Sequence, residues 1–250
     1  MLFIFIIRFH CRKNEKSVII FIMQYEVIQI NENTWRIEDQ GVRFFLLTGS
    51  ERALLIDSGM NVHNARDIAS ELTTLPLSLL NTHADPDHIG SNAQFDEFYM
   101  SPAEEANLRA HGNSGRIVPV GSGTMLDLGD RPLEIIDLPG HTPGSIAVLD
   151  KNARVLISGD PIQDGSIFMF GPFRNMELYI QSLESLTERT SDFDEIWPSH
   201  SSIPVKPALI PELIAGARAV LSGTIAGKPL NLFGNDIHAF NAGCATFLCE

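Results

Sequence analysis

The feature that most constrains this chain is the segment LLNTHADPDHIGSN, residues 79–92, where ionisable side chains directly follow a short apolar run. Two histidines and two aspartates stand within six positions, at His83, Asp85, Asp87 and His88. A folded chain rarely gathers such groups at the end of an apolar strand, because an unpaired charge is expensive to bury. A multivalent cation would make the crowding favourable. The segment therefore predicts a metal site, and a metal site needs further ligands elsewhere in the chain.

The rest of the chain alternates apolar, β-rich runs with amphipathic segments in two successive halves. From their composition and periodicity we expect strands at 23–30, 34–39, 42–49, 53–59, 77–82, 133–141, 145–150, 154–160, 194–200 and 242–250. Helices are expected at 62–72, 101–112, 175–186 and 209–223. Two β-then-α halves predict an α+β fold, a four-layer αββα sandwich of two mixed sheets with helices outside.

Local signals refine two of these helices. Ser101 and Glu104 have the spacing of a capping box, with Pro102 at the first helical position. Asn175 stands where a helix cap is expected before the next amphipathic segment.

Several of the expected strands end at a histidine or an aspartate, which would bring those side chains to one edge of the sheets. Three candidate ligands arise in this way in the second half, at His141, Asp160 and His200. With the four of the first segment they make seven nitrogen and oxygen donors. Seven exceed what one tetrahedral ion needs and suit two ions that share a carboxylate.

Spacing within the first segment divides its ligands between two ions. In an extended segment, positions i and i+2 point the same way, so His83 and Asp85 can face one ion. Pro86 fixes a bend, after which Asp87 and His88 can turn toward a second ion.

Five short sequence blocks that contain the candidate ligands and Asp57 occur in an order that resembles the metallo-β-lactamase superfamily of metallohydrolases. That superfamily has the motif H-x-H-x-D-H, then a Gly-His, a later Asp and a final His. The corresponding blocks here are LLIDSG at 54–59, HADPDH at 83–88, PGHTPGS at 139–145, SGD at 158–160 and PSH at 198–200. The resemblance covers roughly residues 24–223.

The resemblance implies a role for each block. It implies that metal one is held by His83, Asp85 and His141, and metal two by Asp87, His88 and His200. It further implies that Asp160 bridges both ions and that Asp57 supports the ligand loop.

Asp85 departs from the superfamily pattern, which more often has histidine at this position. Three carboxylates against two divalent ions leave a core charge of +1 instead of +2. Such a core favours harder ions and acidifies its water less. We expect two divalent ions, zinc first, with manganese or iron as alternatives.

The expected function is metal-dependent hydrolysis of an ester, thioester, lactone or related acyl substrate by a metal-bridged hydroxide. Asp87 or Asp160 would pass the proton to the leaving group. Two alternatives stay open: a diiron-type oxidoreductase with a separate electron-donor partner, and a small-molecule phosphodiesterase. The resemblance supports the first because the superfamily includes diiron proteins with a carboxylate at the second motif position.

The aromatic segment DGSIFMFGPFRN, residues 164–175, follows the last aspartate of the pattern. Phe168 and Phe170 belong either to the hydrophobic core or to an apolar wall of the substrate pocket. In the pocket interpretation, Arg174 binds a carboxylate or phosphate of the substrate.

Composition limits the partners. The chain of 250 residues has a net charge of −13, which disfavours nucleic acid and anionic membranes and leaves a small-molecule substrate. Three cysteines without a CxxC pair suit a reducing compartment, so we expect a cytoplasmic protein. Residues 1–22 match neither a membrane span nor a secretory signal. They are expected to be an extension outside one domain of residues 23–250. The oligomeric state is left open.

Overall fold

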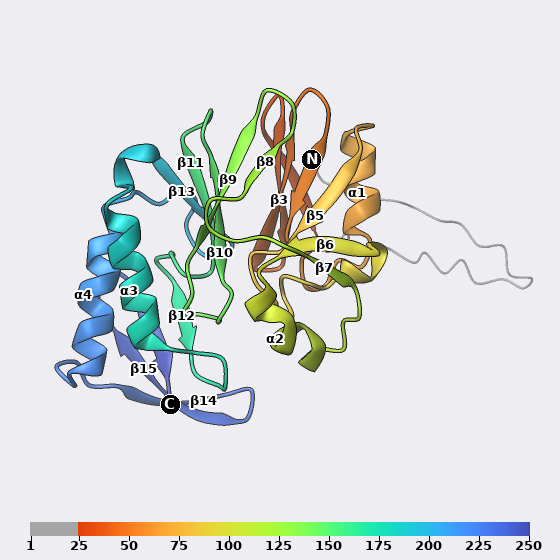
Figure 1. Ribbon diagram of the computed structural model, residues 1–250. Coiled ribbons are helices and arrows are strands. Elements are labelled where there is room, and N and C mark those ends of the chain that lie inside the picture. The colour runs from red at the N-terminus through yellow and green to blue at the C-terminus, as the bar shows by residue number, and fades with distance from the viewer. Residues whose placement is uncertain (1–24) are drawn as a thin grey trace, which may run out of the picture.

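The structure is a computed structural model that describes residues 25–250 (Figure 1). The expected N-terminal extension and the first residues of the first expected strand lie outside this range. A seven-stranded sheet contains, in spatial order, β1 (Glu26–Asn31), β2 (Thr34–Asp39), β3 (Val42–Thr48), β4 (Ala53–Ile56), β5 (Leu77–Leu80), β6 (Glu97–Met100) and β7 (Arg116–Pro119).

Two further sheets complete the β-structure. A five-stranded sheet contains β13 (Glu195–Pro198), β11 (Val155–Gly159), β10 (Ile146–Asp150), β9 (Pro132–Asp137) and β8 (Met125–Asp127). A four-stranded sheet contains β12 (Ser166–Met169), β16 (Thr246–Cys249), β15 (Asn235–Asn241) and β14 (Lys228–Leu232). The two larger sheets are mixed, since β4 to β7 and the β11–β13 pair run parallel and the other pairs antiparallel.

Helices cover the outer faces of the two larger sheets (Figure 1). The α-helices are α1 (Ala65–Leu72), α2 (Glu105–Ala110), α3 (Met176–Thr187) and α4 (Leu209–Leu221). Short 3₁₀ turns occur at η1 (Asn92–Gln94), η2 (Pro102–Glu104) and η3 (Thr190–Asp192). None of the helices within residues 25–250 is long and apolar enough to cross a bilayer.

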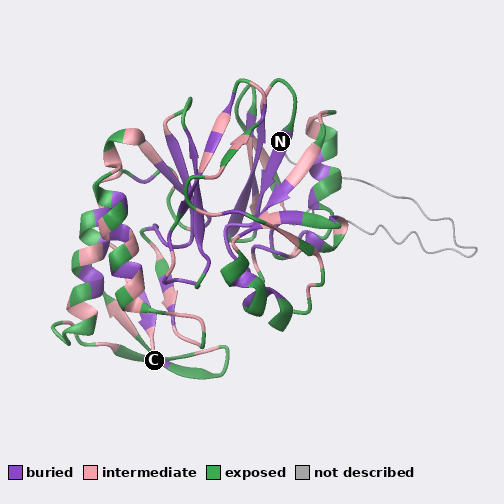
Figure 2. Ribbon diagram, viewed as in Figure 1, coloured by how far each residue is buried: buried purple, intermediate pink, exposed green. Residues whose placement is uncertain are grey.

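Strand β3 shows why the sheets stack in layers. All of its residues are buried, and successive side chains point to opposite faces. Phe44 and Leu46 belong to the core shared with α1, whereas Phe45 and Leu47 belong to the core between the two large sheets. Strand β10 of the facing sheet divides its side chains in the same way. Figure 2 shows these buried layers with exposed residues on the outer helix faces. The predicted αββα sandwich is confirmed.

The structure differs from the sequence-based expectations at several places. Strands β6, β7 and β8 were not expected, and the expected helix 101–112 is the turn η2 followed by the shorter α2. Helix α1 begins at Ala65, not at residue 62, and the backbone N–H groups of residues 60–62 before it all donate to the Asp39 carboxylate. Ser101 makes no capping hydrogen bond, so the capping box is wrong. The four-stranded sheet was not predicted as a unit; only its β16, inside the expected strand 242–250, and the segment of β12 had been singled out.

Candidate metal centre

The seven candidate ligands converge at one edge of the sheets, where the strands that precede them end. The segment 83–88 follows β5, and His141, Asp160 and His200 follow β9, β11 and β13. Their donor atoms form two groups, within each of which all atoms lie within 4.8 Å of one another. One group is His83, Asp85 and His141, and the other is Asp87, His88, Asp160 and His200.

In the first group, the histidine Nε2 atoms face a carboxylate oxygen of Asp85. The Oδ2 atom of Asp85 lies 3.6 Å from Nε2 of His83 and 3.5 Å from Nε2 of His141. Asp160 also presents Oδ2 to this group, at 3.9 Å from Nε2 of His83 and 3.6 Å from Nε2 of His141.

In the second group, the other oxygen of Asp160 takes part. Its Oδ1 lies 3.2 Å from Nε2 of His88 and 3.4 Å from Nε2 of His200. The Oδ2 of Asp87 lies 3.6 Å from Nε2 of His88 and 3.1 Å from Nε2 of His200. Asp160 therefore presents one oxygen to each group, which is the arrangement of a carboxylate shared by two sites.

All four histidines have their Nδ1 atom bonded away from the cluster. The partners are Oγ1 of Thr82 for His83 (3.0 Å), Oδ2 of Asp57 for His88 (2.8 Å), the Phe168 carbonyl for His141 (3.0 Å) and the Gly41 carbonyl for His200 (2.7 Å). Carbonyl and carboxylate oxygens only accept hydrogen bonds, so the last three rings carry their proton on Nδ1 when neutral. Nε2 then offers its lone pair to the cluster.

The buried donor atoms test whether this cluster fits metal ions. Among the described residues, the Nε2 atoms of His83, His88 and His141 and the Oδ1 atom of Asp160 have no hydrogen-bond partner. Each buried polar atom without a partner costs about 1–3 kcal/mol. Cations at the two groups would remove this cost, and imidazole nitrogens mixed with carboxylate oxygens are ligands that zinc, manganese and iron accept. The residues present fit a metal centre.

Neighbouring charges shift the pKa values of side chains in the second group. Burial by itself would raise the pKa of Asp160, but the neighbouring charges of His200 and His88 hold it well below its ordinary value. Burial would lower the pKa of His200, but the negative charge of Asp160 and the nearby carboxylate of Asp87 raise it to about 10. The side chains thus hold strong negative potential at the point where a cation would be bound.

Asp57 supports His88 from behind. It is buried, and its Oδ1 accepts the backbone N–H of Thr82 at 2.7 Å. Its Oδ2 lies 2.8 Å from both Thr82 Oγ1 and His88 Nδ1. Asp57 also adopts a φ of 65°, a left-handed conformation that is uncommon outside glycine and that the hydrogen bonds of its side chain compensate. This contact orients the His88 ring toward Asp160.

Glu104 is a buried support that sequence reasoning missed. Its Oε2 accepts the backbone N–H of Ala84 at 2.8 Å, beside His83, and its Oε1 accepts the backbone N–H of Gly144 at 2.7 Å, in the loop of His141. One carboxylate therefore joins both loops of the first group. The capping-box spacing had assigned this side chain to its own helix, which concealed the role.

Arg43 supports the second group with the opposite chemistry. Its guanidinium donates to three backbone carbonyls, those of Pro198, His200 and Ser201, at 3.2, 3.2 and 2.7 Å. Its own backbone N–H donates to the carbonyl of Ser199 at 2.8 Å. Strand β3 thereby fixes the turn that carries His200. The available sequence signal was an arginine within an apolar strand. Because Arg43 is far in sequence from the metal-ligand motifs, the sequence did not indicate that it supports the turn of His200.

Asp85 has two further partners. Its Oδ1 accepts from Nδ2 of Asn107 at 3.0 Å, and its Oδ2 is paired with the guanidinium of Arg174. Burial would raise the pKa of Asp85, but the adjacent His141 and His83 hold it well below its ordinary value. The pairing of Arg174 with Asp85 was not foreseen from the sequence.

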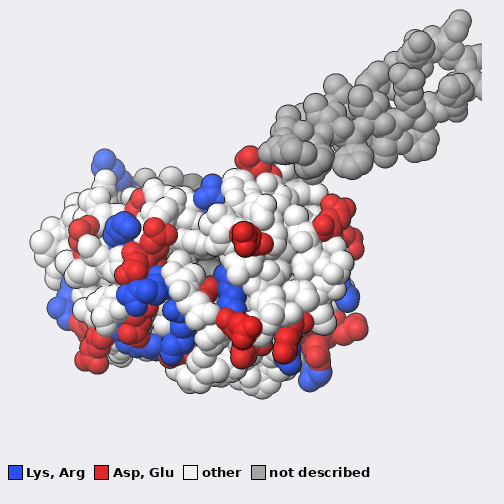
Figure 3. Space-filling view, turned by 90° about the horizontal axis from the view of Figure 1, so that it is seen from above, with Lys and Arg blue, Asp and Glu red and all other residues white. Residues whose placement is uncertain are grey.

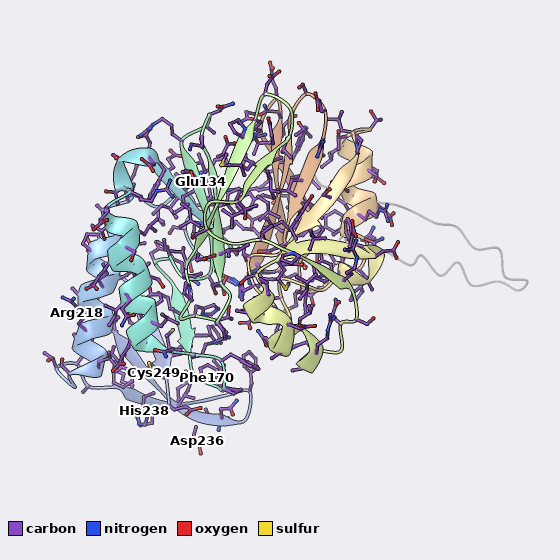
Figure 4. The ribbon with its side chains drawn as sticks, in the orientation of Figure 1. Glu134, Phe170, Arg218, Asp236, His238 and Cys249 are labelled. Carbon is purple, nitrogen blue, oxygen red and sulfur yellow. The ribbon has the colours of Figure 1, made fainter. Side chains whose placement is uncertain are left out.

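A cavity of about 800 Å³ opens onto the cluster, and Asp85, Asp87, Asp160, His200 and Arg174 are part of its lining. Its apolar wall contains Met60, Phe168, Phe170, Pro172, Phe173 and Phe233. The ring of Phe168 lies 5.5 Å from that of Phe170 and stacks at 6.5 Å on that of Phe233. In Figure 4, Phe170 is labelled on the side of the molecule that carries the β14–β15 hairpin. Phe168 and Phe170 line this cavity, and its use as a substrate pocket stays a prediction.

Phe233 was not predicted from the sequence as a cavity residue. It stands at the turn between β14 and β15, and its side chain is 82% exposed. On the face of the molecule shown in Figure 3, Lys and Arg lie among Asp and Glu.

Comparison with known families agrees with this geometry. The model of the metallo-beta-lactamase superfamily matches residues 38–196. The chain therefore belongs to the metallo-β-lactamase superfamily. Strands β14 to β16 and the turn with Phe233 lie beyond the matched segment.

The relatives that the chain resembles have different named activities. The chain is 28% identical over 196 residues to acyl-coenzyme A thioesterase MBLAC2 of Gallus gallus, covering 62% of this chain and 71% of the relative. It is 30% identical over 142 residues to hydroxyacylglutathione hydrolase of Gloeobacter violaceus, covering 54% and 55%. A solved metallo-beta-lactamase from Pontibacter korlensis superposes with a TM-score of 0.66 at 18% identity, covering 78% of this chain and 99% of that one. This likeness shows a shared fold.

Proposed function

We propose that this protein hydrolyses thioesters with an apolar acyl group, using two divalent metal ions. The observation that carries the proposal is a cluster of buried donor atoms without partners at one end of a largely aromatic cavity. In the proposal, one ion is held by His83, Asp85 and His141 and the other by Asp87, His88 and His200, with Asp160 shared. Zinc is the first expectation, with manganese or iron as alternatives.

When bound, two such ions supply an activated water as nucleophile and polarise the carbonyl that it attacks. The protein provides a proton acceptor beside that position. Asp87 is 26% exposed and borders the cavity, whereas Asp160 is 7% exposed with both oxygens between histidines. Asp87 is therefore the better placed of the two to take a proton from the nucleophile.

The nature of the leaving group favours a thioester over other acyl compounds. A thiol has a pKa of about 8.5, so it departs as a thiolate with little need for a proton donor. An alkoxide or an amine would require a well-placed acid. The named activities of two relatives, an acyl-coenzyme A thioesterase and a hydroxyacylglutathione hydrolase, are both thioester hydrolyses and support the same choice.

The cavity wall supports an apolar acyl group. A ligand pocket with several aromatic side chains and a few convergent polar groups binds an apolar body and orients one reactive end. Here the polar end is the cluster, and the aromatic wall includes Phe168, Phe170 and Phe233. An acyl chain along this wall would place its carbonyl next to the cluster.

The test is hydrolysis of acyl-coenzyme A thioesters of increasing chain length, beside an acyl-glutathione thioester and a p-nitrophenyl ester. Metal content would be measured by mass spectrometry before and after chelation. We expect about two metal equivalents, turnover of the thioesters that rises with acyl length, and loss of turnover on chelation with recovery on metal return.

Other outcomes would overturn the proposal in different ways. Hydrolysis of a bis-p-nitrophenyl phosphate probe without thioester turnover would favour the phosphodiesterase alternative. Two iron atoms with dioxygen consumption and no hydrolysis would favour the oxidoreductase alternative. Thioester hydrolysis that survives complete metal removal would disprove the metal-dependent mechanism.

A further inference from the structure

The pairing of Asp85 with Arg174 changes the charge balance at the first group of donors. Asp85 stands where the superfamily pattern more often has a neutral histidine, so it adds one negative charge. The guanidinium of Arg174 contacts the same oxygen, Oδ2, that faces Nε2 of His83 and Nε2 of His141. The carboxylate is therefore shared between an arginine and the position of a metal ion.

Asp85 and Arg174 form a largely buried ion pair. The side chains of Asp85 and Arg174 are 15% and 13% exposed. Ion pairs in such partly dry sites are screened less than surface pairs, and removing one partner leaves a poorly solvated charge. The Nε atom of Arg174 has no hydrogen-bond partner among the described residues, so the guanidinium is held mainly through Asp85.

The formal charge of the metal centre depends on whether Arg174 is included. Two divalent ions with Asp85, Asp87 and Asp160 give +4 − 3 = +1. Adding Arg174 gives +2, the value that the histidine pattern reaches with two carboxylates and no arginine. Arg174 thus restores the balance that the aspartate removes.

We propose that Asp85 and Arg174 act as one net-neutral unit that takes the place of a histidine ligand. In this unit Asp85 supplies the donor atom, and Arg174 is a positioning residue that fixes the carboxylate and cancels its charge. The unit rests on the proposed metal centre, but it is independent of the choice of substrate.

If Arg174 balances the charge of Asp85, removing it from the Asp85→His variant should raise zinc affinity. If Arg174 were merely structural, the same removal would not raise it. In Asp85→His, the unpaired guanidinium faces the first ion without a carboxylate. We expect zinc affinity at one site to fall by about ten- to a hundredfold, the range for losing a partner around a metal ligand. In Asp85→His with Arg174→Gln, the repulsion is gone, and affinity should recover most of this loss. Arg174→Gln alone should weaken zinc binding far less than Asp85→His does, because losing the contact that fixes Asp85 is offset by losing a positive charge near the ion.

Charge and hydrogen bonding can be separated by a third variant. Asp85→His with Arg174→Lys keeps the positive charge, so it should remain as weak as Asp85→His alone. A matched control is the surface pair Arg154–Asp194, whose side chains are 44% and 68% exposed. The parallel cycle of Asp194→His and Arg154→Gln should leave zinc binding unchanged.

The measurement is zinc stoichiometry and affinity by competition with a chromophoric chelator, with folding followed by circular dichroism. If Asp85→His does not fold, Asp85→Asn with and without Arg174→Gln gives the same cycle with a smaller change of shape. A double variant that binds zinc no better than Asp85→His, or an Asp85→His protein with unchanged affinity, would overturn the neutral unit. Because zinc binding is read directly, failure of the thioester proposal would leave this result interpretable.

Discussion

The two groups of donor atoms differ in how the fold supports them. The first group is the more deeply buried: His83 and His141 are 0% and 1% exposed. In the second, His200 and Asp87 are 23% and 26% exposed. A carboxylate, Glu104, gathers backbone N–H groups around the first group, whereas a guanidinium, Arg43, gathers backbone carbonyls around the second. Opposite charges thus perform the same task of fixing a loop.

This difference indicates that the two groups of donor atoms have different roles. A buried group with side-chain charges on every side suits a position whose geometry must not change. A partly exposed group that borders the cavity suits a position where substrate and water exchange. We therefore expect the first group to govern metal retention and the second to govern turnover.

The largest effect is expected where the two groups meet. Asp160→Asn removes the charge of the one carboxylate that faces both groups. We expect loss of both metal ions and a fall in kcat of roughly a thousandfold, or about 4 kcal/mol. Metal analysis and steady-state kinetics would measure this, with the exposed Asp96→Asn as control. Retention of two ions in Asp160→Asn would contradict a shared carboxylate.

Removal of Arg43 should act on the second group alone. Arg43→Met keeps an unbranched apolar stem but deletes the donors to the turn that carries His200. Hydrogen bonds from a charged group contribute about 1.5–3 kcal/mol each, so the turn should loosen. We expect kcat to fall about a hundredfold while one metal equivalent is retained. Titration of the apoprotein with zinc would detect the remaining site; loss of both equivalents would show that the groups are not independent.

Glu104→Gln should act on the first group alone. The amide replaces one acceptor oxygen with a donor, so one of the buried N–H groups of Ala84 and Gly144 loses its partner. This costs about 1–3 kcal/mol, and supports around ligands typically change metal affinity by about ten- to a hundredfold. We expect zinc affinity at one site to fall by about tenfold with a smaller change in kcat than in Arg43→Met. Equal effects on both sites would contradict the different roles of the two groups.

Much of this architecture was predictable from sequence because it depends on local patterns. Alternating apolar strands predicted the layers, and strands that end in His or Asp predicted where the seven donors meet. Asn175 was expected to cap α3, and its side chain accepts the backbone N–H of Leu178 at 2.9 Å. Such features lie within a few residues of one another in the chain.

The roles of Glu104, Arg43 and Arg174 as supports were not predictable, because each depends on contacts between distant segments. Glu104 reaches a loop 40 residues away, and Arg43 reaches one 155 to 158 residues away. The partner of Arg174 is 89 residues from it in sequence. A charged residue in a single sequence carries no sign of which backbone group it will meet. Phe233 shows the same limit, since only folding brings its hairpin to Phe168.

The smallest effect is expected at the cavity wall, which is connected to the first group through β12. The carbonyl of Phe168 accepts from Nδ1 of His141, while its ring stacks on Phe233. Phe233→Ala removes apolar surface from the wall without touching a donor atom. We expect the KM for long-chain thioesters to rise about three- to tenfold, or roughly 1 kcal/mol, with KM for short-chain thioesters and zinc content unchanged.

The control is Phe233→Leu, which keeps apolar surface at the tip of the hairpin and should retain most of the affinity for long chains. KM measured across a series of acyl lengths would separate the two variants. A uniform rise in KM for every chain length would place Phe233 against the thiol part of the substrate instead. A change in zinc content would mean that the hairpin acts through Phe168 on His141, and the wall and the first group would then be one unit.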